Sequence, residues 1–366
     1  MGFQNYIFIV LSILLLGFFV VLIKLKPIKK VWLKRLTKIV VIIAVKIMVL
    51  SVIIFPDFTS VETTGKYSYV SCTLELTDEL RIENFKSGGN FRKLSVLVYY
   101  PDDNTIKNGT CPLIVFSHGG ISYSASNISL YKELASHGYV VVSIDHTYHA
   151  LFTKIDGKII FIDSGYMKEL KTEDSHKNIE NSYACFHKWM ELRTGDINFV
   201  MDTFIEKAVK ENDSFYPLIN TENIGVIGHS LGGSAAFGIA RQRNDIKAVI
   251  ALESPFIYDI TSIDNDKFIW NTEPYSCAIM NIYSDKGYPL IKADNKYEQN
   301  KNYLYNDGNV EYYYIQGSNH YTLTDLVRKS PVLCALLGGG YEKSGYDTLK
   351  FINEKCLIFF NTYLNK

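Results

Sequence analysis

The sequence predicts an α/β protein, with a mainly parallel sheet covered by helices and an apolar region ahead of it. Beyond residue 56, short apolar runs alternate with helical stretches, which is typical of parallel strands joined by crossover helices. Several runs are β-branched throughout, as expected where helices cover both faces of the sheet. A chain of 366 residues with 47% hydrophobic residues is long enough for one large domain and an additional segment.

The elements follow from these runs in chain order. Strands are expected at 93–101, 112–120, 139–146, 223–230, 247–253, 277–285 and 310–320. Helices are expected at about 128–137, 195–209, 231–242 and 346–363. Residues 151–192 interrupt the alternation, and we interpret them as an insertion with a hairpin around 154–163.

The first 56 residues have the composition of a membrane anchor. Residues 6–23 carry no charge and are long enough to cross a hydrocarbon core. A signal peptide fits less well, because no basic residue precedes this run and no small-residue cleavage site follows it. A basic loop, 24–38, leads to a second apolar run, 39–55, with Lys46 at its centre.

We expect both runs to span the membrane; the alternative for the second is an amphipathic helix lying on the membrane surface. Two spans would keep the basic loop in the cytoplasm and place residues 57–366 outside it. The sequence therefore predicts a membrane protein with an anchor over 1–56 and an extracytoplasmic α/β domain over 57–366.

Charge and cysteine content exclude some functions. Because residues 1–56 hold eight of the 38 basic residues and no acid, the remainder carries 30 basic and 38 acidic residues. An acidic domain is a poor candidate for binding nucleic acid. The six cysteines are scattered without a C-x-x-C pair or a Cys/His cluster, which argues against a structural zinc site.

The segment from Gly228 to Gly232 is G-x-S-x-G, placed after an expected strand and before an expected helix. This is the context of a nucleophile elbow, in which a tight turn presents the serine away from the sheet. The residues two before and two after the serine must be small to fit this turn. The N-terminus of the following helix favours negative charge that develops nearby. Ser230 is therefore the predicted nucleophile.

A serine nucleophile needs a base, and the base needs an acid to orient it. His320 follows the last expected strand, where an α/β-hydrolase has its histidine. The pair His146 and His149 raises the alternative of a metal site, but no further ligand cluster accompanies it. The acid stays open between Glu253 and Asp285, since each ends an expected strand; the commonest hydrolase layout selects Asp285.

An oxyanion hole requires two backbone N–H groups. One is expected from Leu231, directly after the serine. The other is expected from the turn that contains Gly119 and Gly120, after the strand at 112–120.

Five segments, in order and at similar spacing, resemble the plasma-type platelet-activating-factor acetylhydrolase family and its bacterial membrane-tethered relatives. They are "PLIVFSHGG", "YKELASHGYVVVSIDH", "NIGVIGHSLGG", "KAVIALE" and "IQGSNH", and the resemblance covers most of residues 60–365. It implies an α/β-hydrolase fold and selects Glu253 as the acid rather than Asp285. The family usually has Asp at that position, so Glu is a departure. The resemblance also implies that the oxyanion amides belong to Gly120 and Leu231, and it implies no metal and no other cofactor.

The sequence thus predicts a membrane-anchored serine carboxylic-ester hydrolase in which Ser230, His320 and Glu253 form the triad. By resemblance, its substrate is a phospholipid or other lipid with a short or oxidised acyl chain, as for a 1-alkyl-2-acetylglycerophosphocholine esterase. One alternative is a catalytically silent module that binds a lipid or a partner protein at the cell surface. Another is a serine hydrolase that acts on peptides or polyesters.

Overall fold

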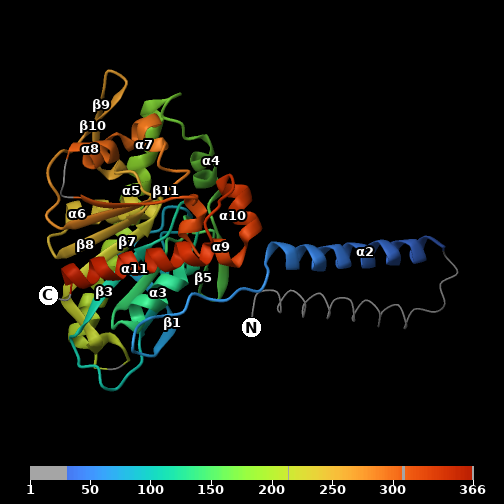
Figure 1. Cartoon of the computed structure of the whole chain (residues 1–366), viewed down its shortest axis with the longest axis horizontal. Helices are drawn as coiled ribbons and strands as arrows, with labels where there is room; N and C mark the ends of the chain where they lie inside the picture. Colours follow the sequence, from blue (N-terminus) through green and yellow to red (C-terminus); the bar gives the residue numbers. More distant parts are fainter. Residues whose placement is uncertain (1–30, 213, 307–309, 365–366) are drawn as a thin grey trace.

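The computed structural model describes residues 31–212, 214–306 and 310–364, and an eight-stranded sheet forms the centre of this part of the chain (Figure 1). Its strand order is β1-β2-β4-β3-β7-β8-β11-β12. The strands are β1 (Tyr69–Ile82), β2 (Phe91–Pro101), β3 (Cys111–Ser117), β4 (Val140–Asp145), β7 (Ile219–His229), β8 (Ile246–Leu252), β11 (Ala278–Ser284) and β12 (Val310–Ile315).

The sheet is mostly parallel, as predicted. Strands β4, β3, β7, β8, β11 and β12 pair in parallel, whereas β1 and β2 add an antiparallel edge. All seven predicted strands are present with ends shifted by a few residues. Strand β1 was not predicted, because exposed residues alternate with more buried ones along it and the segment has no continuous apolar run.

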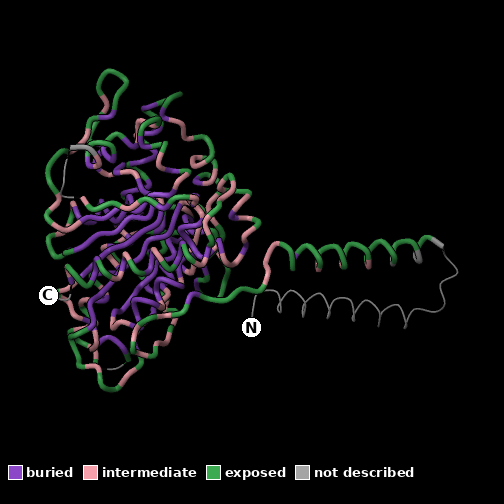
Figure 2. The backbone as a smooth tube through the Cα atoms, viewed as in Figure 1, coloured by how far each residue is buried: buried purple, intermediate pink, exposed green. Residues whose placement is uncertain are grey.

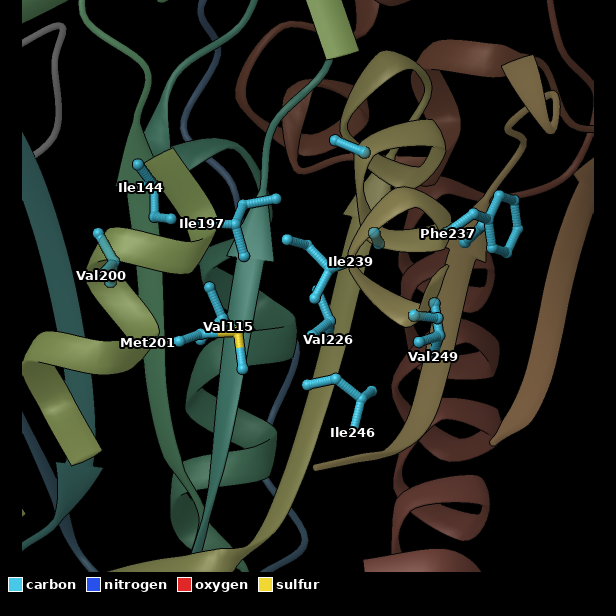
Figure 3. Packing of buried hydrophobic residues seen from close by; sticks show 14 of the residues in the cluster. Val115, Ile144, Ile197, Val200, Met201, Val226, Phe237, Ile239, Ile246 and Val249 are labelled. Carbon is cyan, nitrogen blue, oxygen red and sulfur yellow. The ribbon is translucent and has the colours of Figure 1, made fainter. Parts of the chain in front are cut away.

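Helices cover both faces of the sheet, and successive residues of a strand face opposite layers. Leu113 and Val115 of β3 pack in the cluster that includes α5 (Ile179–Lys210) and α6 (Leu231–Gln242). Ile114 and Phe116 pack in the cluster that includes α3 (Ile128–Ser136) and α11 (Gly345–Leu364). Figure 3 shows α5 and α6 side chains, among them Met201 and Ile239, against the strands. Figure 2 shows the buried strands between these layers.

The predicted insertion is shorter than expected. The hairpin is confirmed as β5 (Phe152–Ile155) and β6 (Lys158–Phe161), and α4 (Ser164–Thr172) follows it. Residues from 179 onward, however, belong to α5, which continues without a break to Lys210. The apolar face of that helix packs in the core, so its first turns are part of the domain rather than an addition to it.

Several shorter elements follow β8. They are the hairpin β9 (Ile260–Asp264) and β10 (Lys267–Trp270), then α7 (Leu290–Ala293), α8 (Glu298–Asn306), α9 (Leu326–Lys329) and α10 (Pro331–Gly338). All six cysteines are free.

The first predicted span, 6–23, lies outside the described residues. Most of the second, 39–55, lies in α2 (Val31–Ile54), which extends away from the α/β body in Figure 1 and is largely exposed in Figure 2. Among the described residues, none of the helices has the length and apolar character needed to cross a membrane.

Candidate active site

Ser230 occupies a sharp corner between β7 and α6. Its backbone has φ 54° and ψ −125°, a conformation that costs a non-glycine residue free energy and is held by the surrounding structure. The two flanking glycines make the corner possible. A Cβ on Gly228 would lie 2.2 Å from the carbonyl carbon of Gly232, and one on Gly232 would lie 2.0 Å from the Ser117 carbonyl oxygen. The sequence "GHSLG" thus folds as the predicted elbow.

His320 lies after β12, at the first position of a short 3-10 helix, His320–Leu323. Its Nδ1 is 2.6 Å from Oε1 of Glu253, which follows β8. Because the carboxylate can only accept, Nδ1 carries the proton and Nε2 keeps a free lone pair when the ring is neutral. The imidazole therefore has the tautomer that a general base for a serine requires.

The carboxylate of Glu253 is buried and fixed by a second hydrogen bond. Its Oε2 accepts the amide N–H of Ser284 at 2.6 Å. Residue 287 must be glycine here, since a Cβ would lie 2.2 Å from Cδ of Glu253. Glu253 itself has φ 54°, so the chain turns sharply where the strand ends. Nothing in the sequence pattern indicated the role of Gly287.

Asp285, the rival acid, lies away from His320. Its carboxylate accepts hydrogen bonds from the Tyr314 hydroxyl and from the Gly317 amide, the latter at 3.0 Å. The structure therefore brings Glu253 to the histidine and leaves Asp285 apart from it.

Two neighbours hold the backbone around His320. The Asn319 side chain accepts the amides of Tyr321 and Thr322 and donates to the Cys334 and Gly340 carbonyls. His229 Nε2 lies 3.1 Å from the His320 carbonyl oxygen. Burial, followed by the charge of nearby His320, keeps the pKa of His229 well below its ordinary value. His229 is therefore neutral and donates through Nε2. The sequence analysis did not assign it a role.

The predicted oxyanion donors lie on either side of the serine. Leu231 begins α6, so its N–H has no intrahelical acceptor. Gly120 lies in the loop after β3, and β3 is the neighbour of β7 in the sheet. Among the described residues, the Gly120 N–H has no backbone acceptor. Both amides lie at the carboxyl ends of parallel strands, where crevices of such sheets open.

Ser230, Leu231, Glu253, His320 and Gly120 all line one pocket of about 380 Å³. Its apolar wall comes from α4, α5, α7 and α10 and from the segment after β8: Leu170, Phe186, Trp189, Ile257, Leu290 and Leu337. Three charged side chains, Glu173, Lys286 and Lys296, also line it. A serine, a histidine–carboxylate pair and a largely apolar wall together suit an ester with an apolar acyl group.

A second set of serine, histidine and acid is buried in the protein. Ser117 Oγ is 2.8 Å from His146 Nε2, and His146 Nδ1 is 3.0 Å from Asp196 Oδ2. All three residues are wholly buried or nearly so, and none of them lines the pocket. Burial lowers the pKa of His146 to about 4, against the partial opposition of Asp196, so the ring is neutral. An ester could not reach Ser117 without unfolding of the surrounding core.

Among the described residues, His146 and His149 have no further side chains beside them that could complete a metal site. His149 stacks on Tyr166, with ring centroids 3.5 Å apart and planes 2° from parallel. In the part of the chain that the structure describes, no three His, Cys, Asp or Glu side chains are grouped to hold a metal ion.

The mostly parallel sheet, its two helical layers and the serine elbow define an α/β-hydrolase. The same fold is seen in a solved ferulic acid esterase from Streptomyces cinnamoneus, with a TM-score of 0.59 at 19% identity over 84% of this chain and 94% of that one. The family model described as platelet-activating factor acetylhydrolase, isoform II, matches residues 100–366, and the chain belongs to that family.

Individual relatives match over shorter stretches. A platelet-activating factor acetylhydrolase of Canis lupus familiaris is 26% identical over 156 residues, which is 39% of this chain and 35% of the relative. Cutinase 2 of Thermobifida cellulosilytica is 27% identical over 155 residues, which is 42% of each chain. The alignments therefore span between about a third and two fifths of these relatives' own length.

Proposed function

We propose that this chain is a serine carboxylic-ester hydrolase that acts on lipids with short or oxidised acyl chains. The observation that carries the proposal is the 2.6 Å contact between His320 Nδ1 and Glu253 Oε1 in a pocket that also holds Ser230. Membership of the acetylhydrolase family supports the choice of ester chemistry, and the canine relative supports the lipid substrate.

In this mechanism Ser230 Oγ attacks the ester carbonyl carbon while His320 Nε2 takes its proton. Glu253 holds the imidazole and stabilises the imidazolium that forms. The amides of Gly120 and Leu231 bind the oxyanion of the tetrahedral intermediate. His320 then returns the proton to the leaving alcohol, and water attacks the acyl-enzyme by the same route to release the acid.

The test replaces each of the two candidate serines. Ser230→Ala should lower kcat for a short-chain ester by about 10⁴-fold or more, because triad members act as a unit. It should also abolish labelling by a fluorophosphonate probe. Ser117→Ala is the matched control and should keep both activities within about threefold, since Ser117 is buried away from the pocket. Loss of activity in the control alone would assign the chemistry to Ser117.

A polyester substrate is the second candidate, since cutinases are among the relatives that match this chain. Comparing a soluble short-chain ester, a phospholipid with an acetyl chain and an insoluble polyester would separate the candidates. No turnover and no probe labelling with any of them would instead indicate a silent binding module.

We also propose that residues 1–56 attach the domain to a membrane, with residues 57–366 outside the cytoplasm. Its support is the uncharged run 6–23 and the exposed apolar side chains of α2, such as Ile43 at 51% and Leu50 at 54% exposure. Protease added to intact cells should then digest the α/β domain. Digestion only after the membrane is opened would place the domain in the cytoplasm.

A further inference from the structure

Arg193 of α5 is a wholly buried cation that is bound mainly by backbone carbonyl groups. Its Nη1 donates to the His118 carbonyl, and its Nη2 donates to the Gly119 carbonyl at 3.1 Å. In the described part of the chain it makes no ion pair with a carboxylate. Burying a guanidinium without a counter-ion is costly, so a role beyond packing is expected.

The buried acid Asp196, also on α5, does not offset this charge. Asp196 lies one turn further and contacts Arg92 Nε at 2.6 Å and Arg81 Nη2 at 2.9 Å. Burial alone would raise the pKa of Asp196, but Arg92 beside it holds that pKa well below its usual range. The acid is therefore ionised and already paired, and the positive charge of Arg193 faces the loop after β3.

The contact with Gly119 fixes the direction of the next amide. In a planar trans peptide the C=O of one residue and the N–H of the next point in opposite directions. Because the Gly119 oxygen faces Arg193, the Gly120 N–H faces the other way. Gly120 itself lines the pocket that contains Ser230.

Two more side chains hold the same loop. His118 Nδ1 is 2.7 Å from the Gly119 oxygen, and burial keeps the pKa of His118 well below its ordinary value. The neutral ring thus donates through Nδ1. The Tyr166 hydroxyl donates to the Gly120 carbonyl at 3.2 Å and lies 3.4 Å from Arg193 Nη2. Arg193 is the charged member of this group.

We propose that Arg193 is a positioning residue for the oxyanion hole. It holds the His118 and Gly119 carbonyls inward and thereby directs the Gly120 N–H toward Ser230. A cation that donates to the Gly119 oxygen also polarises that peptide, which strengthens Gly120 N–H as a donor to a developing oxyanion. This inference rests on the proposed esterase function and deepens it.

The test compares Arg193→Lys and Arg193→Met with Arg241→Lys. Arg241 is the matched control, because it is also largely buried and binds a carboxylate, Asp259 at 2.8 Å, and a backbone carbonyl, Glu273 at 2.7 Å, away from the serine loop. Arg193→Met should lower kcat by about 100-fold with KM changed less than about threefold, as for loss of one oxyanion donor. Arg193→Lys keeps the charge and should retain more of kcat. Arg241→Lys should leave kcat within about threefold.

Binding of a boronic acid provides a measurement that a general loss of packing would not reproduce. A boronate bound to the serine is tetrahedral and resembles the intermediate. Its inhibition constant should rise for Arg193→Lys by the same factor as kcat/KM falls, even if Arg193→Met does not fold. The proposal would be overturned if the Arg193 variants kept the wild-type kcat. It would also be overturned if the inhibition constant of the boronic acid did not change in step with kcat/KM.

The two proposals fail in different ways. If the wild-type chain is not labelled at Ser230 by a fluorophosphonate, the proposed function itself is wrong. If the wild type is labelled and the Arg193 variants are labelled at the same rate, only the role of Arg193 is wrong.

Discussion

At residue 253 the chain has Glu where the family resemblance led us to expect Asp, and the structure accommodates the longer side chain. The extra methylene carries the carboxylate to within 2.6 Å of His320 and toward the position that a Cβ of residue 287 would fill. Glycine at 287 leaves that position open. Glu at position 253 therefore requires glycine at position 287, although the two residues are far apart in the sequence.

Exchange of the acid should distinguish the two carboxylates. Glu253→Gln should lower kcat by about 10³-fold or more, because the negative charge that stabilises the imidazolium is lost and the amide can reverse the tautomer. Asp285→Asn should stay within about tenfold, since its carboxylate binds Tyr314 and Gly317 instead. Steady-state kinetics of both variants measures the ranking. A larger loss of kcat in Asp285→Asn than in Glu253→Gln would instead assign the acid to Asp285, as in the commonest hydrolase layout.

At the scale of elements, the sequence predicted the strands and helices with continuous apolar or periodic patterns most closely. Helix 231–242 agrees residue for residue with α6, and the elbow before it was recognisable from five residues. The start of α5 was missed because its first turns mix polar residues with Phe186 and Trp189, which face the pocket and the core. Hydrophobic periodicity does not reveal a helix that lines the pocket with its first turns and packs against the core with its later turns.

The wall of the pocket could not be predicted for a related reason. The exposed apolar residues of the predicted insertion, such as Phe161 at 67% exposure, lie on the hairpin. Other residues of the same stretch, Leu170 of α4 and Phe186 and Trp189 of α5, line the pocket. Only the packing of α4 and α5 over the sheet edge determines which of these apolar side chains meet the serine.

This wall predicts the preferred acyl length. Each methylene that fits contributes about 0.8 kcal/mol of burial, and those beyond the wall add strain. For a series of esters from acetyl to palmitoyl, kcat/KM should peak at short chains and then fall. Leu170→Ala should move the peak to longer chains, because it removes side-chain volume from the wall. A steady rise to palmitoyl in the wild type would contradict the short-chain proposal.

At the scale of the whole molecule, four buried histidines make the fold sensitive to acid. Burial keeps the pKa of each of them below its ordinary value: His118, His146, His149 and His229. For His146 the ordinary value is 6.5 and the folded value about 4. The unfolded chain therefore binds more protons between these values, and stability present above pH 6.5 is lost as the pH falls toward 4. His146 alone contributes about 3 kcal/mol.

Asp145 opposes this effect. Burial raises its pKa from 3.8 to about 6, so it adds stability as the pH falls through that window. Four histidines outweigh it, and urea denaturation should give a lower free energy of unfolding at pH 4.5 than at pH 7. Asp145→Asn should steepen the fall by removing the opposing contribution. A free energy of unfolding that rises on acidification would show that the histidines are protonated in the folded chain.

The order of the strands also governs when the serine becomes reactive during synthesis. β1 to β7 and the corner at Ser230 leave the ribosome first, but the corner needs β8, because the Ser230 amide donates to the Leu252 carbonyl. The base comes later still, at residue 320, and Asn319 beside it bonds carbonyls as far along as Gly340. A growing or prematurely ended chain therefore carries the serine without its base. A chain that ends before residue 320 should therefore fold part of the sheet without hydrolysing an ester.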